Sequence, residues 1–81
     1  MFYTYILESE SSHSYYIGSC ENVNKRLGLH NQGAVISTKR YRPWELVYSE
    51  EFGDRNGARR RELEIKGLKK RSAIQRIISN P

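Results

Sequence analysis

The sequence predicts an α+β domain with the element order ββαβαα. Three segments rich in aromatic and β-branched residues alternate in polarity, as half-buried strands do. Three other segments repeat apolar residues three or four positions apart, as amphipathic helices do. A chain of 81 residues is expected to form one domain, spanning 1–81, with a core of modest size. These observations predict a small sheet packed against helices.

Two strands are expected at the start of the chain. Residues 2–7 alternate, and Tyr5 lies on one of the two faces of that strand. A polar, serine-rich segment follows, as in the turn of a hairpin. Residues 14–18 then form the returning strand, with Tyr16 and Gly18 on the same face. The chain is expected to turn at Gly18.

A helix is expected next. Asn22 is a suitable N-cap, and Gly33 is a suitable residue to end the helix. On a helical projection Val23 and His30 share a face, and Arg26 lies beside it. Arg26 and His30 are four residues apart, so their side chains are neighbours. A cation and an imidazole along the inner face of a helix indicate that they line a cleft.

The second half of the chain is expected to add a strand and two helices. Residues 34–43 are irregular or form a short helix, and residues 44–52 form the third strand. Asp54 is expected to cap a helix that runs to about Leu68, with Glu62 on its inner side. The last helix is expected where four apolar residues recur: Ala73, Ile74, Ile77 and Ile78.

The charge balance indicates either a polyanionic partner or a soluble surface that happens to be basic. The chain has 14 Lys and Arg against 9 Asp and Glu, a net charge of +5 and a pI near 9.6. Nucleic acid is the commonest partner of so basic a domain. Cys20 is the only cysteine, which excludes an internal disulfide and a zinc cluster. With no signal peptide and no membrane-spanning run, a cytoplasmic protein is expected.

Several motifs stand at the spacing of a known family: Tyr3-Thr4-Tyr5, Tyr16-Ile17-Gly18, Arg26 with His30, Arg40-Tyr41-Arg42-Pro43, Leu46-Val47-Tyr48, Ala58-Arg59-Arg60-Arg61-Glu62 and Ile65-Lys66-Gly67. Together they resemble the GIY-YIG nuclease superfamily, in its single-domain bacterial branch. That branch is similar to the N-terminal nuclease domain of the excinuclease subunit that incises damaged DNA. The resemblance covers nearly the whole chain.

The resemblance implies a three-stranded antiparallel sheet flanked by helices and a site that cleaves phosphodiesters. It implies that Glu62 holds one divalent metal ion, Mg²⁺ or Mn²⁺. Tyr16 would act as, or beside, the general base, and Tyr5 would orient the attacking water or the water shell of the metal. Arg26 would stabilise the pentacovalent phosphate, and His30 would assist proton transfer.

The sequence departs from the family pattern at two places. The first motif reads Tyr-Thr-Tyr instead of Gly-Ile-Tyr, so only Tyr5 is carried over. Ser19 follows Gly18 where the excinuclease subunit carries a lysine that contacts its site. The resemblance therefore implies that one phosphate contact is lost.

The residue types suit phosphodiester hydrolysis, which needs an activated water and neutralised phosphoryl oxygens. Mg²⁺ often binds one or two carboxylates and keeps several waters, so Glu62 alone is an adequate ligand. Arg26 offers a planar, permanently charged fork to a phosphate. A tyrosine has an unperturbed pKa of about 10 and is a poor base at neutral pH, so Tyr16 and His30 both stay candidates for the base.

Each candidate also has a purely structural interpretation. Tyr5 and Tyr16 could be sheet aromatics, Arg26 a solvated residue and His30 a core histidine. Glu62 could be an i,i+4 partner of Lys66. Their combination at the family spacing favours a catalytic site.

Basic residues outside this constellation are expected to contact DNA phosphates: Lys39, Arg40, Arg42, Arg60, Lys69 and Lys70. Such contacts are sensitive to salt and carry little sequence information.

Three functional hypotheses follow from the sequence. The first is a metal-dependent DNA endonuclease that selects structure over sequence, acts on branched or damaged DNA in repair or recombination, and is targeted by a partner protein. The second is a nucleic-acid-binding module that has lost turnover. The third is a protein-interaction domain of a repair complex.

Overall fold

A three-stranded antiparallel sheet is the centre of the fold in the computed structural model, which describes residues 1–80. The strands are β1 (Phe2–Ser9), β2 (Tyr15–Cys20) and β3 (Trp44–Phe52), in the order β2-β1-β3. β1 is therefore the middle strand, and β2 lies at an edge. The α+β class and the antiparallel sheet expected from the sequence are confirmed.

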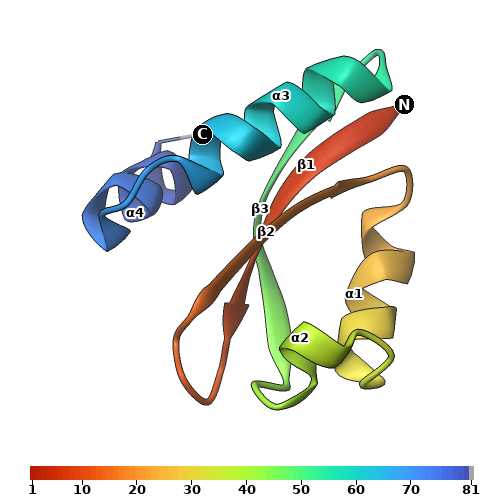
Figure 1. Ribbon diagram of the computed structural model, residues 1–81, viewed down its shortest axis with the longest axis vertical. Coiled ribbons are helices and arrows are strands. Elements are labelled where there is room, and N and C mark those ends of the chain that lie inside the picture. Colours follow the sequence, from red (N-terminus) through yellow and green to blue (C-terminus); the bar gives the residue numbers. More distant parts are fainter. Residues whose placement is uncertain (81) are drawn as a thin grey trace.

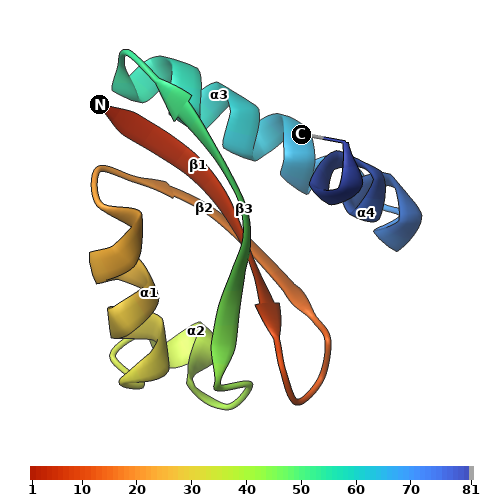
Figure 2. The same ribbon diagram turned by 180° about the vertical axis from the view of Figure 1, so that it is seen from behind.

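The helices cover both faces of this sheet. Helices α1 (Val23–Asn31) and α2 (Ile36–Lys39) lie on one face, and α3 (Arg55–Lys66) and α4 (Arg71–Ser79) on the other (Figure 1, and from behind Figure 2). The segment expected to be irregular or a short helix contains the four residues of α2. Among residues 1–80, no helix combines the length and the apolar character that a bilayer crossing requires.

Two separate apolar layers hold these helices to the sheet. The layer under α3 and α4 is built around Ile6, Ile17, Ile65 and Ile74. The layer under α1 is built around Tyr5, Leu7 and Trp44, with Tyr16, Val23 and Leu27 packed against it. Because β1 contributes to both layers, its side chains are buried on both faces from Thr4 to Leu7.

The helix ends agree with the caps expected from the sequence. The side chain of Asn22 accepts a hydrogen bond from the backbone N–H of Lys25 at 3.0 Å. Asp54 does the same for the N–H of Gly57 at 2.7 Å. Gly33 follows α1 with a φ of 81°, a conformation in which a side chain would be strained.

The expected turn at Gly18 is wrong, because Gly18 lies inside β2 and pairs with Tyr5 of β1. A Cβ atom at position 18 would lie 2.5 Å from the hydroxyl oxygen of Tyr5 and 2.7 Å from its Cζ. The glycine is therefore needed because the Tyr5 ring crosses the backbone of the edge strand. The strand continues for two residues and ends at Cys20.

The strict alternation expected for the third strand is also wrong. Ile6 pairs with Tyr48, whereas the next residue, Leu7, pairs with Leu46, so Val47 is an extra residue in β3. This bulge turns Leu46 toward the layer under α1 and Tyr48 toward the layer under α3 and α4. A one-residue bulge of this kind leaves no clear signal here, because Leu46, Val47 and Tyr48 are three consecutive apolar or aromatic residues.

Gly18→Ala is expected to destabilise the fold. The added methyl group must displace the buried Tyr5 ring, and overpacking of this kind costs about 1–3 kcal/mol. Thermal unfolding should occur at least about 4 °C lower, since 1 kcal/mol shifts a domain of this size by about 4–8 °C. The matched control is Gly28→Ala in α1, where no atom lies within 4 Å of the added Cβ. That variant should gain about 0.5–1 kcal/mol, and equal melting temperatures for the two variants would contradict the Gly18 contact.

Candidate active site

The candidate residues form two groups, because successive side chains of the edge strand β2 point to opposite faces of the sheet. Tyr16 and Gly18 face α1, and Ser19 faces α3, where its side chain bonds Glu62. We call Tyr5, Tyr16 and His30 the phenol–imidazole group. Glu62 and the side chains that bond it form the carboxylate group.

The rings of the phenol–imidazole group are in contact with one another. The ring centroids of Tyr16 and His30 are 4.7 Å apart, and that of Tyr5 lies 6.3 Å from each of the other two. The Tyr5 hydroxyl lies 3.4 Å from Nε2 of His30, which is a long hydrogen bond. No hydrogen-bond partner of the Tyr16 hydroxyl occurs among residues 1–80, so Tyr16 carries the free phenol of the group.

Thr38 fixes the proton arrangement of His30. The Thr38 hydroxyl donates to the carbonyl of Val35 at 3.3 Å, so its oxygen is left to accept from Nδ1 of His30 at 2.8 Å. The proton of a neutral His30 then lies on Nδ1, and Nε2 is free to accept the hydroxyl proton of Tyr5. The side chain of His30 is fully buried. It can therefore reach a substrate only through Tyr5.

Burial shifts the pKa of both His30 and Tyr5 in this chain of hydrogen bonds. Burial, together with the nearby charge of Arg26, lowers the pKa of His30 and keeps the imidazole neutral at pH 7. Burial raises the pKa of Tyr5 far above its usual value. Tyr5 is therefore a protonated donor at neutral pH.

Glu62 is the centre of the carboxylate group and is only 4% exposed. Ser19 donates its hydroxyl proton to Oε1 of Glu62 at 2.7 Å, and Lys66 donates to Oε2 at 2.6 Å. Arg59 bonds both carboxylate oxygens, at 3.1 and 3.2 Å. The expected inward direction of Glu62 is confirmed, and its expected partner Lys66 is present as well.

The bonds to Glu62 set its charge. Burial by itself raises the pKa of this carboxyl group, but hydrogen bonds from Lys66 and Ser19 and the charges of Lys66 and Arg59 outweigh it. The net result is a pKa below the usual value. Glu62 is therefore an anion at neutral pH, as a metal ligand must be.

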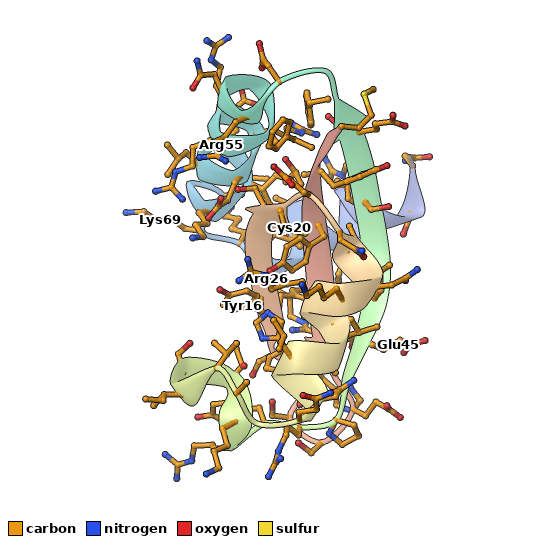
Figure 3. All side chains as sticks on the ribbon, turned by 90° about the vertical axis from the view of Figure 1, so that its right-hand side faces the viewer. Tyr16, Cys20, Arg26, Glu45, Arg55 and Lys69 are labelled. Atoms are coloured by element: carbon orange, nitrogen blue, oxygen red, sulfur yellow. The ribbon has the colours of Figure 1, made fainter. Side chains whose placement is uncertain are left out.

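Arg26 is exposed on α1, and its charge acts on Tyr5 and His30 of the phenol–imidazole group. Figure 3 shows Tyr16, Arg26 and Cys20 in the space between α3 and α2. The positive charge of Arg26 lowers the pKa of Tyr5, and the negative charge of Glu62 raises it. Both charges therefore act on the same phenol. The five candidates thus gather around one edge of the sheet, although only Arg26 among them lines the cavity found there.

The carboxylate group fits a divalent ion that keeps most of its water ligands. Among residues 1–80, no three His, Cys, Asp or Glu side chains gather as they do in a closed metal site. Glu62 offers hard oxygen atoms, which Mg²⁺ and Mn²⁺ prefer. Arg59 and Lys66 occupy these oxygens, and their side chains are 59% and 45% exposed. A metal ion at Glu62 would have to displace them.

The six residues expected to contact DNA are all exposed, and they fall into separate places. Lys39, Arg40 and Arg42 lie at α2 and Arg60 lies in α3, whereas Lys69 and Lys70 lie between α3 and α4 (Figure 1). The structure does not bring them into one patch.

Sequence reasoning missed four polar residues of this region. Ser19 was interpreted as a lost contact, yet it orients Glu62. Thr38 and Arg59 also bond candidate residues. Arg55 lies at the first position of α3, beside the cavity. The only sequence signal for Arg55 is its position, because a cation at a helix N-terminus opposes the helix dipole.

Comparisons with known proteins show which proteins this chain is similar to. The family described as "GIY-YIG catalytic domain" matches residues 1–76. UPF0213 protein SH2523 of Staphylococcus haemolyticus is 38% identical over 76 residues, which cover 93% of this chain and 92% of the relative. A UPF0213 protein of Clostridium perfringens is 39% identical and covers 98% of this chain and 85% of the relative. The solution NMR structure of the UPF0213 protein BH0048 of Bacillus halodurans has a TM-score of 0.59 and 33% identity, with 99% and 86% of the two chains covered.

Thr38→Val is expected to destabilise the fold more than Thr38→Ser. The valine leaves the Nδ1 proton of buried His30 without an acceptor, which costs about 1–3 kcal/mol, whereas serine keeps the hydroxyl. Urea unfolding measures the difference. A ¹⁵N spectrum of the wild type should also find the Nδ1-protonated, neutral ring, with a titration midpoint below 6.5. Equal stabilities of the two variants would argue against the bond.

The stability of the fold is expected to fall in acid partly through Glu62. Because its folded pKa lies below the usual value of 4.5, its contribution is complete above that pH and is lost as the pH falls through the folded pKa. Glu62→Gln should therefore lose less stability than the wild type between pH 5 and pH 3. Urea midpoints at both pH values test this, and Glu64→Gln, exposed on the same helix, is the control. Parallel losses in all three proteins would contradict it.

Proposed function

The chain belongs to the GIY-YIG catalytic domain family, and on this premise we propose that it is a metal-dependent endonuclease that hydrolyses DNA phosphodiester bonds. The observation that carries the proposal is the buried, ionised Glu62, held by Ser19 on one face of β2 while Tyr16 lies on the other face. A purely structural role for the Glu62 carboxylate would not explain why the Tyr16 phenol and the Arg26 guanidinium lie at the same edge of the sheet.

In this proposal Glu62 holds one Mg²⁺ or Mn²⁺ ion through its carboxylate oxygens. The ion would supply a Lewis acid for the phosphoryl oxygens and several ordered waters. Ser19 keeps one oxygen of Glu62 oriented while Lys66 and Arg59 turn away. Those two cations are then free to contact the polyanionic substrate.

Tyr16 is the proposed group that meets the attacking water. Its hydroxyl is the free phenol of the site, and it is only partly buried. His30 acts through Tyr5, because both of its nitrogens are engaged within the core. Tyr5, held protonated, donates toward Nε2 of His30 and so stays in a fixed orientation. Arg26 would bind the phosphoryl oxygens as their charge grows, since its side chain is exposed and permanently charged.

The proposed substrate is DNA recognised by its structure and not by its sequence. The fold measures only 30 × 27 × 18 Å, and its basic residues are scattered in places suited to phosphate contacts. We assign the activity to a single domain in the cytoplasm, in DNA repair or recombination, with a partner protein that targets it to branched or damaged sites.

A binding module without turnover is the second candidate. The observation that favours it is the saturation of Glu62 by Lys66 and Arg59, which compete with any metal ion for the same oxygens. It predicts DNA binding without cleavage in the presence of Mg²⁺ or Mn²⁺.

Glu62→Gln and Tyr16→Phe are each expected to lower cleavage at least about 100-fold, the usual minimum for loss of acid–base or electrostatic assistance. The assay incubates linear, flapped and branched DNA with Mg²⁺ or Mn²⁺ and measures the products on a denaturing gel. Glu64→Gln is the matched control, because Glu64 is exposed on the same helix, and it should cut as the wild type does. If the wild type and Glu62→Gln leave every substrate equally intact, the endonuclease proposal fails.

A further inference from the structure

A cavity of about 480 Å³ lies beside the end of β2. The cause is a difference in strand length: β2 ends at Cys20, which pairs with Tyr3, so Phe2 has no partner on that side of β1. The chain then leaves the sheet for α1, while α3 begins on the opposite face (Figure 1). The starts of these two helices and Phe2, the first residue of β1, border the cavity.

The walls of this cavity are basic. Lys25 and Arg26 of α1 and Arg55 of α3 line it, and Glu21 is the one acidic residue among the lining side chains. Neither Lys25 nor Arg55 has a salt bridge to any residue from 1 to 80. Arg55 also lies at the N-terminal end of α3, whose first turn contains no acid, so the helix dipole disfavours its charge there. The cations of Lys25 and Arg55 are therefore not neutralised by an ion pair among residues 1–80, although Arg55 packs on the Phe2 ring.

Phe2 gives the cavity an aromatic wall. The guanidinium carbon of Arg55 lies 5.6 Å from the centroid of the Phe2 ring, which is half-buried. Proteins that bind single-stranded DNA combine these two features, a basic groove for the backbone and an aromatic ring on which a base stacks. An acidic peptide would use the cations but would not use the aromatic ring.

The cavity is continuous with the candidate active site. Ser19, which donates to Glu62, and Arg26 are both part of its lining. A nucleotide in the cavity would thus lie next to the phosphate that Glu62 and Arg26 are proposed to bind. Cys20, the only cysteine of the chain, lines it as well.

The volume of the cavity limits the size of the ligand that can enter it. It falls within the range of about 300–1,000 Å³ that is typical of pockets for small ligands. A DNA duplex is much wider than such a space, since its major groove alone is about 12 Å across. The cavity therefore has room for one or two unpaired nucleotides and not for base-paired DNA.

We propose that the cavity between α1 and α3 binds an unpaired nucleotide of the DNA strand beside the phosphate to be cut. Lys25 and Arg55 contact its phosphates, and its base stacks on Phe2. This inference rests on the proposed function, and it narrows the substrate to DNA with a single-stranded segment at the cleavage point, such as a flap or a branch.

The test separates binding from cleavage. Fluorescence anisotropy in EDTA, in the Glu62→Gln background, measures the affinity for flapped DNA of either polarity and for a blunt duplex of the same length. Arg55→Ala should weaken binding of flapped DNA about 5- to 100-fold and leave the duplex unchanged. It should also lower the salt slope of flap binding by about 0.7, the value for one lost phosphate contact to a single strand.

Phe2→Leu removes the stacking surface but keeps an apolar residue in β1. It should weaken flap binding by about 5-fold or more, the lower end for loss of one base–aromatic contact, without any change of the salt slope. Arg76→Ala on α4 is the control for a lost surface charge, since Arg76 is exposed on the other side of the sheet from α1. The affinity of this control for flapped DNA should match that of the wild type.

Cys20 provides an independent measurement in the wild-type protein. A flapped oligonucleotide at saturating concentration should slow the alkylation of Cys20 by iodoacetamide, and a blunt duplex should not. Unchanged alkylation, or equal flap affinities for wild type, Arg55→Ala and Phe2→Leu, overturns the inference. Either result leaves the endonuclease proposal standing if the wild type cuts DNA. A third outcome is that Arg55→Ala and Phe2→Leu weaken flap binding as expected while the wild type cuts no DNA. That outcome overturns the endonuclease proposal and keeps the cavity as a DNA-binding site.

Discussion

The passage of the Tyr5 ring over the backbone at Gly18 is the contact on which the rest of the site depends. Only a residue without a side chain leaves room for that ring beside the edge strand. Tyr5 then reaches His30 of α1, and His30 reaches Thr38 of α2. One close approach between two strands therefore fixes the positions of two helices on the same face of the sheet. The glycine of the Tyr-Ile-Gly motif is a packing requirement and not a turn signal.

The edge position of β2 explains how so small a fold carries a polar site. Side chains of a middle strand are buried on both faces, as those of β1 are from Thr4 to Leu7. An edge strand can instead direct a phenol to one face and a hydroxyl to the other while staying open to solvent at its side. The phenol–imidazole group and the carboxylate group thus lie on different faces of the sheet, yet both lie at the same edge of it. Each group includes one helical residue, His30 of α1 or Glu62 of α3.

The charged and polar partners of Glu62 offset the cost of burying its carboxylate. A buried carboxylate without partners would be costly, and Lys66, Arg59 and Ser19 remove that cost. Two of these partners, Lys66 and Arg59, are partly exposed cations on the same helix as Glu62. Ser19 stays in place because its side chain is short. A serine at this position thus holds the acid in place instead of supplying a charge.

The sequence by itself determined the fold class, the caps at Asn22 and Asp54 and the inward face of Glu62, because hydrophobic period and local capping chemistry decide these features. The family spacing also selected Tyr5, Tyr16, Arg26, His30 and Glu62 as one set. Only the tertiary structure decided that Gly18 lies within a strand, that Val47 is a bulge and that Thr38 and Ser19 bond the candidate residues. These features depend on strand register and on contacts between residues far apart in the chain. Neither is encoded in the pattern of a single segment, since a shift of one residue in register reverses the face of every side chain.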